Sequence, residues 1–218
     1  MNAVAEREEI RIPAGDASLA GELDIPEGSP SVIVFAHGSG GGRSSPRNRF
    51  VSSVLRDQGF GTLLFDLLTP EEGEIDVHTA HLRFDIGFLA ERLERATAWL
   101  LAERPRIAPI GFFGASTGAA AALVTAARIP GDVGAIVSRG GRPALAGAFL
   151  DAVRAPVLLI VGGADPAILR ENESALDALR GEKRLHVVPE ATHLFEEPGA
   201  LEEVAREAGS WFLRHLRH

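Results

Sequence analysis

The 218-residue sequence contains no cysteine, which excludes disulfides, a thiolate nucleophile and cysteine-ligated zinc. It also lacks a basic surplus. Its 22 Lys and Arg face 30 Asp and Glu, so we expect neither nucleic acid nor a membrane as partner. No apolar run approaches the roughly 20 residues that a membrane span needs. The first residues, MNAVAEREEIRI, lack a signal-peptide core, and a cytoplasmic protein is expected.

The sequence does contain a series of short apolar runs that do not alternate with polar residues. Such runs are typical of strands buried on both faces of a parallel sheet. They lie at 31–36, 61–67, 107–113, 133–137 and 156–161, with a weaker run at 184–188. Two alternating segments, 9–12 and 18–25, predict an antiparallel edge pair that turns at 14–16.

Helical patterns separate the apolar runs. They cover roughly 47–58, where Ser45-Pro46 favours a helix start, and also 83–104, 117–128 and 200–216. This alternation predicts an α/β fold with a mostly parallel sheet of about eight strands and helices on both faces. Because the pattern indicates one core, we expect residues 1–218 to form a single domain without a large cap.

The segment IAPIGFFGASTG places Gly-x-Ser-x-Gly between an apolar run and an Ala-rich helix. This strand–turn–helix context is the one that the nucleophile motif requires, with Ser116 at its centre. Small neighbours let strand and helix pack closely, and the helix N-terminus favours a developing oxyanion. Two alternatives are a chance Gly/Ser turn and a dinucleotide-binding glycine turn. The spacing is not GxGxxG, and no acidic residue ends the next strand.

A serine nucleophile needs an adjacent base, and that base needs an orienting acid. With this motif the order along the chain is serine, acid, histidine, each after its own strand. Asp165 follows the run PVLLIV, and His193 follows RLHVV. Separately, Asp165 is also compatible with a helix cap and His193 with an ordinary loop residue. Their order and positions predict a Ser116–His193–Asp165 triad.

The first buried run ends in the glycine-rich loop HGSGGGR. Acyl transfer needs two preorganised donors at the carbonyl oxygen. We expect these to be the N–H groups of Ser39, in this loop, and of Thr117, after the nucleophile. The alternative is a phosphate-binding loop, but the GKS or GKT ending of such a loop is missing.

Further side chains are candidates for contact with substrate. Arg43, Arg47, Arg139 and Arg142 lie in loops expected to border the site, where one of them is a candidate for binding a substrate carboxylate. The interpretation that we favour is that they tie loops to nearby carboxylates or carbonyls. Phe195 is a candidate pocket wall or core residue. His78 and His81, near Asp76 and Asp85, form either a metal site or, as we expect, a polar loop before a helix.

Together, the segments HGSGGGRSSPRN, GFFGASTG, VSRGGRP, GGADP and ATHLF resemble the dienelactone hydrolase family of the α/β-hydrolase superfamily, over nearly the whole chain. The resemblance implies a compact hydrolase fold without a cap. The best-known members use a cysteine nucleophile and carry a glutamate in the loop after the third strand. Here Ser116 replaces the cysteine and His37-Gly38-Ser39 offers no acid, which favours an ester mechanism with a neutral serine.

These observations predict a serine hydrolase that cleaves small carboxylic esters through an acyl-enzyme on Ser116. We expect a small-molecule ester substrate, no cofactor and no metal, and a monomer or homodimer. Lactones, thioesters, peptides and phosphotriesters are alternative substrates for the same residues. A non-catalytic or nucleotide-binding α/β protein is the alternative of a different class.

Overall fold

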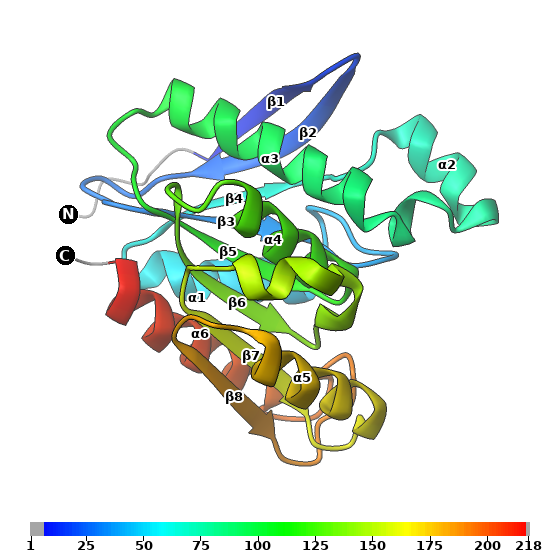
Figure 1. The fold of residues 1–218 in the computed structure, drawn as a ribbon. Coiled ribbons are helices and arrows are strands. Elements are labelled where there is room, and N and C mark those ends of the chain that lie inside the picture. Colours follow the sequence, from blue (N-terminus) through cyan, green and yellow to red (C-terminus); the bar gives the residue numbers. More distant parts are fainter. Residues whose placement is uncertain (1–6, 217–218) are drawn as a thin grey trace.

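A computed structural model describes residues 7–216, and its centre is one eight-stranded sheet in the order β1-β2-β4-β3-β5-β6-β7-β8 (Figure 1). The strands are β1 (Glu8–Ala14), β2 (Ala17–Asp24), β3 (Val32–Ala36), β4 (Gly61–Phe65), β5 (Ile110–Ala115), β6 (Val133–Arg139), β7 (Val157–Gly162) and β8 (Lys183–Val188). Only the contacts of β2 with β1 and β4 are antiparallel. The predicted α/β fold with a mostly parallel sheet is therefore confirmed.

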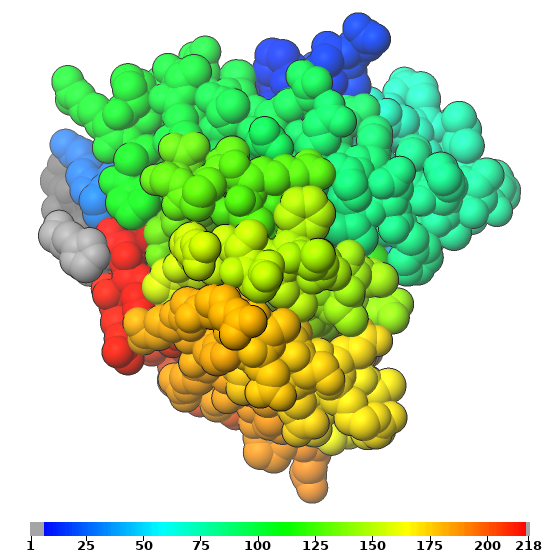
Figure 2. All heavy atoms as spheres, in the orientation of Figure 1, coloured from blue at the N-terminus to red at the C-terminus, as the bar shows by residue number. Residues whose placement is uncertain are grey.

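Helices cover both faces of the sheet, as predicted. One face carries α1 (Pro46–Asp57) and α6 (Ala200–Leu216). The other carries α3 (Ile86–Glu103), α4 (Thr117–Arg128), the 3₁₀ segment η2 (Pro143–Ala152) and α5 (Pro166–Ala178), the face seen in Figure 2. No helix within residues 7–216 is both long enough and apolar enough to cross a membrane.

Burial on both faces explains why the strand sequences do not alternate. In β3, Val32, Val34 and Ala36 pack in the core under α3 and α4, whereas Ile33 and Phe35 pack in the core under α1 and α6. Successive side chains point to opposite faces, so each must be apolar. The strand predicted at 107–113 begins later in the structure, at Ile110. It begins after Pro109, because proline has no N–H to donate to a neighbouring strand.

One helix lies where the sequence predicted a loop. Where a polar loop was predicted around His78, the structure contains α2 (Pro70–Thr79), followed by the short 3₁₀ turn η1 (Leu82–Phe84). The reason is a capping box: the Thr69 hydroxyl accepts the Glu72 N–H, and the Glu72 carboxylate accepts the Thr69 N–H. This helix is polar and largely exposed, so hydrophobic periodicity does not reveal it; it projects at the edge of the molecule (Figures 1 and 2).

Candidate active site

Ser116 lies on a strained turn between β5 and α4, with φ 50° and ψ −118°. A non-glycine residue adopts this conformation only where the surroundings hold it. Here the Ser116 N–H donates to the Arg139 carbonyl at 3.3 Å. The Ser116 carbonyl accepts from the N–H groups of Ala119 and Arg142, both at 3.2 Å. The backbone is thus fixed on both sides of the residue, and the side chain lies at the carboxyl edge of the sheet.

The glycines of the motif permit close contact between α4 and the sheet. A Cβ added at Gly114 would overlap the backbone of Ala119, within α4. A Cβ added at Gly118 would overlap the carbonyl oxygens of Ala36 and His37. The first turn of α4 therefore packs directly against the end of β3, which brings the loop after β3 beside Ser116.

Asp165 and His193 meet at the same edge, from the loops after β7 and β8. Asp165 Oδ2 lies 2.8 Å from His193 Nδ1. The loops that carry them are joined by the Ala164 N–H, which donates to the Ala191 carbonyl at 2.9 Å. Asp165 also caps α5, because Oδ1 accepts the Ile168 N–H at 3.4 Å. The two interpretations of Asp165, helix cap and partner of a histidine, therefore both describe contacts that are present.

Ser116 and His193 line one open cavity of about 640 Å³, together with Ser39 and Arg139. The Ser116 hydroxyl makes no hydrogen bond within the described chain, so contact with the imidazole requires adjustment of these side chains. Such contacts are often long without substrate and shorten when substrate binds. The structure thus pairs His193 with Asp165 and brings both Ser116 and His193 to the lining of one cavity.

The two expected oxyanion donors, Ser39 and Thr117, both line a second cavity of about 460 Å³ at the loop after β3. Ser39 also lines the cavity beside Ser116, whereas Thr117 does not. Neither N–H has a hydrogen-bond acceptor in the part of the chain that the structure describes. At Gly38 a Cβ would lie 2.8 Å from the Ser116 Cβ, so the glycine allows the loop to approach the nucleophile.

His37 has a structural role that the motif alone did not reveal. It is buried, and Nε2 accepts the Leu67 N–H at 2.9 Å, which leaves Nδ1–H to donate to the Gly38 carbonyl at 3.0 Å. Burial lowers the pKa of His37 and keeps the imidazole neutral, as this pairing requires. His37 therefore fixes the loop that carries Ser39 against the chain after β4.

A comparison with models of protein families assigns the chain to one family. The model of the dienelactone hydrolase family matches residues 19–215. The chain belongs to the dienelactone hydrolase family. This confirms the resemblance seen in the motifs.

The dienelactone hydrolase from Anabaena variabilis shares 52% sequence identity and a TM-score of 0.96, over 99% of this chain and 100% of that one. A lidless α/β serine hydrolase from Xanthomonas campestris shares 22% identity and a TM-score of 0.78, over 98% and 96% of the two chains. This second likeness concerns the fold alone.

A Mycobacterium tuberculosis protein named "Putative phosphoribosyl transferase" is 54% identical over 211 residues, which are 96% of this chain and 46% of that protein. The same match occurs in two strains. The present chain thus spans less than half the length of these curated relatives.

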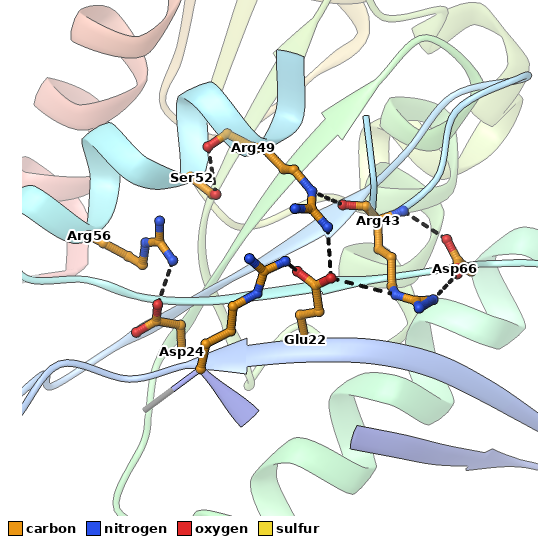
Figure 3. A network of polar contacts seen from close by, with 8 residues as sticks. Glu22, Asp24, Arg43, Arg49, Ser52, Arg56 and Asp66 are labelled. Atoms are coloured by element: carbon orange, nitrogen blue, oxygen red, sulfur yellow. Dashed lines mark hydrogen bonds and ion pairs between the residues drawn. The ribbon is translucent and has the colours of Figure 1, made fainter. Parts of the chain in front are cut away.

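In this member of the dienelactone hydrolase family, Arg43 holds the loop after β3. Its N–H and its guanidinium donate to the Asp66 carboxylate at 2.7 and 2.9 Å, and Glu22 lies 3.7 Å away (Figure 3). Glu22 also accepts from Arg49 of α1 at 2.8 Å. Arg43 is not among the residues that line the cavity beside Ser116.

Two more of the residues predicted to contact substrate, Arg142 and Phe195, also lie outside the lining of this cavity. Arg142 donates to Glu171 at 3.1 Å, away from the cavity. Phe195 is buried in the core under α6. Its ring centroid lies 5.9 Å from the guanidinium carbon of Arg139. Five residues were candidates for substrate contact, and the structure brings two of them, Arg47 and Arg139, into the lining of the cavity. The other three, Arg43, Arg142 and Phe195, lie outside it.

The residues around the His78–His81 pair form no metal site. Asp76 accepts from the Leu82 N–H at 2.6 Å and from Arg83 Nε at 2.6 Å, so its oxygens are engaged. Asp85 caps α3 by accepting the Phe88 N–H at 2.9 Å. Within residues 7–216 there is no group of three or more side chains that could hold a metal ion.

Proposed function

We propose that the protein is a serine hydrolase of small carboxylic esters, with Ser116 as nucleophile, His193 as base and Asp165 as orienting acid. The observation that carries the proposal is the 2.8 Å Asp165–His193 pair at the cavity where the strained Ser116 turn presents its hydroxyl. Membership of the dienelactone hydrolase family supports hydrolysis as the class of reaction.

Asp165 sets the tautomer of His193. Because the carboxylate accepts from Nδ1–H, the lone pair of Nε2 is left to accept the Ser116 hydroxyl proton. Ser116 Oγ then bonds to the ester carbonyl carbon, and the carbonyl electrons move to oxygen. The free N–H groups of Ser39 and Thr117 supply the donors for that oxyanion, aided by the dipole of α4.

Collapse of the tetrahedral intermediate breaks the bond to the leaving alcohol, which takes the proton from the His193 imidazolium. Water then gives a proton to His193 and attacks the acyl carbon, and Ser116 Oγ takes that proton back from His193 as the bond to the acyl group breaks, which releases the acid. The Asp165 carboxylate stabilises the imidazolium in both halves of the reaction.

Other electrophiles are consistent with the same side chains. The Anabaena protein is named a dienelactone hydrolase, which makes lactones the next candidate; thioesters, peptides and phosphotriesters follow. The transferase name of the mycobacterial relatives belongs to proteins more than twice as long. The contact between Asp165 and His193 beside Ser116 argues against a non-catalytic role.

Turnover of p-nitrophenyl acetate tests the proposal. Ser116→Ala should lower kcat/KM by at least about a thousandfold, since it removes the attacking oxygen. Ser210→Ala, which removes a hydroxyl from the exposed side of α6, is the matched control and should keep the wild-type rate. Equal rates for wild type and Ser116→Ala would refute the assignment of the nucleophile.

A further inference from the structure

Arg139, at the end of β6, is a buried cation that contacts the Phe195 ring but has no carboxylate partner within residues 7–216. The residue lines the cavity beside Ser116 and His193, yet it is only 8% exposed. Within residues 7–216, Nε and Nη1 are buried and have no hydrogen-bond acceptor. An isolated buried charge is costly, and such a group is retained where it binds something of opposite charge.

The charges near Arg139 do not neutralise it. Burial, reinforced by the positive charge of Arg47, lowers the pKa of Arg139 to about 10. Of the described residues that line the cavity, only Asp66 is acidic, and its carboxylate is held by Arg43. The exposed Glu196 pairs with Arg47 at 3.1 Å, outside the cavity lining. Arg139 is therefore a guanidinium without a compensating carboxylate at the lining of the cavity.

The N-terminus of α1 faces the same cavity, which Ser44, Ser45, Arg47 and Asn48 all line. The Ser45 side chain makes no capping hydrogen bond, and the first turn contains no acidic residue. The first helical bond runs from the Arg49 N–H to the Ser45 carbonyl, so the N–H groups of Arg47 and Asn48 have no backbone acceptor in the described chain. A 12-residue helix thus points a free, positive end into the cavity.

We propose that Arg139, Arg47 and the N-terminus of α1 form a phosphate-binding subsite, and that the substrates are small esters carrying a phosphate group. This inference rests on the proposed function, because it concerns the substrate of the same site. A tetrahedral phosphate presents three oxygens and up to two charges. It can accept from the Arg139 guanidinium and from helix N–H groups at once, whereas a planar carboxylate offers two oxygens and one charge.

Binding of inorganic phosphate tests the subsite without any turnover. Phosphate should bind to Ser116→Ala, measured by calorimetry, and raise its Tm. Arg139→Gln in that background should weaken binding by about 10- to 100-fold, because hydrogen bonds to charged groups are lost. Arg128→Gln is the matched control, since Arg128 lies against Glu94 and Phe149 rather than in this cavity. Equal phosphate affinity with and without Arg139 would overturn the proposal.

A structural role for Arg139 predicts a different result. If Arg139 served mainly to hold the fold, Arg139→Gln would lower the Tm without phosphate. The proposal instead expects an unchanged or higher Tm, because an uncompensated buried charge is removed. Arg139→Lys, which keeps the charge and loses the planar fork, should give intermediate phosphate affinity and serves if the Gln variant does not fold.

Three matched acetate esters then test the substrate class: acetylglycerol, acetylglycerate and acetylglycerol 3-phosphate. We expect the phosphate ester to exceed the neutral ester in kcat/KM by at least about tenfold, and Arg139→Gln to remove most of that ratio. A higher value for acetylglycerate than for the phosphate ester would overturn the assignment to phosphate.

Failure of the two proposals can be told apart. If Ser116→Ala binds phosphate in an Arg139-dependent way but none of the esters is hydrolysed by wild type, the hydrolase proposal fails and the subsite stands. If acetylglycerol is hydrolysed while phosphate neither binds nor improves turnover, the subsite fails and the hydrolase proposal stands.

Discussion

One carboxylate, Asp165, makes two separate contacts: Oδ2 lies 2.8 Å from His193 Nδ1, and Oδ1 accepts the Ile168 N–H at the start of α5. The orientation of the imidazole is therefore coupled to the start of a helix. Because the two oxygens serve different partners, substitutions at this residue can separate the catalytic role from the structural one.

Asp165→Asn should lower kcat/KM for esters by about a thousandfold to ten-thousandfold, because the amide no longer stabilises the imidazolium or selects the Nδ1–H tautomer. Its carbonyl oxygen still caps α5, so urea unfolding should show little change. Asp165→Ala removes the cap as well and should lower the free energy of unfolding by about 1 kcal/mol. Near wild-type turnover in Asp165→Asn would show that Asp165 does not serve the base.

The strained backbone of Ser116 predicts that a glycine at this position gives a more stable protein than an alanine. Ser116→Gly should raise the free energy of unfolding by about 1 kcal/mol over Ser116→Ala, since glycine adopts φ 50° without a Cβ clash. Both variants lack the hydroxyl and should be inactive. Chemical denaturation of the pair measures the difference; equal stability would mean that the turn stores no strain.

Two glycines in helices give a matched test of packing. Gly118→Ala should destabilise the protein by about 3 kcal/mol or more, because the new methyl would overlap the carbonyls at the end of β3. Gly73→Ala, in α2, meets nothing within 4 Å and should stabilise by about 0.5–1 kcal/mol through helix propensity. Thermal unfolding of both variants checks the signs, and equal tolerance at the two positions would argue against close packing of α4 on β3.

His37 makes stability depend on pH. Burial lowers its pKa in the folded state, so below the unfolded value of about 6.5 the unfolded chain binds one more proton at this residue. This contribution is fully present above pH 6.5 and is lost as the pH falls, by up to about 1.4 kcal/mol per pH unit. NMR titration of the His37 ring, with urea unfolding of wild type and His37→Asn between pH 7.5 and 5.5, measures it. An His37 ring that titrates at or above 6.5 would contradict the prediction.

Much of the architecture follows from local patterns. Five apolar runs located the buried strands β3 to β7, and two alternating segments located β1 and β2. The strand β8 was recognisable although its sequence is partly exposed. The Gly-x-Ser-x-Gly motif located the turn at Ser116, because sterics require those glycines. The patterns missed α2, which a capping box defines while its surface stays polar, and they did not mark α5.

The roles of the arginines were not predictable from sequence, because guanidinium partners come from distant segments. Arg43 meets Asp66, 23 residues away, and becomes part of a loop anchor. Arg142 meets Glu171, 29 residues away. Arg139 differs only in that folding gives it no carboxylate, a property that no spacing along the chain encodes. The pairing of His37 with the Leu67 N–H is of the same kind, since a backbone donor leaves no mark in the sequence.

The central claim is that Ser116 is the nucleophile, and covalent labelling tests it most directly. Treatment with a fluorophosphonate should add one phosphonyl group to the intact protein, and peptide mapping should place it on Ser116. Ser116→Ala should remain unlabelled under the same conditions. An unlabelled wild-type protein, or an adduct on another residue that persists in Ser116→Ala, would contradict the account.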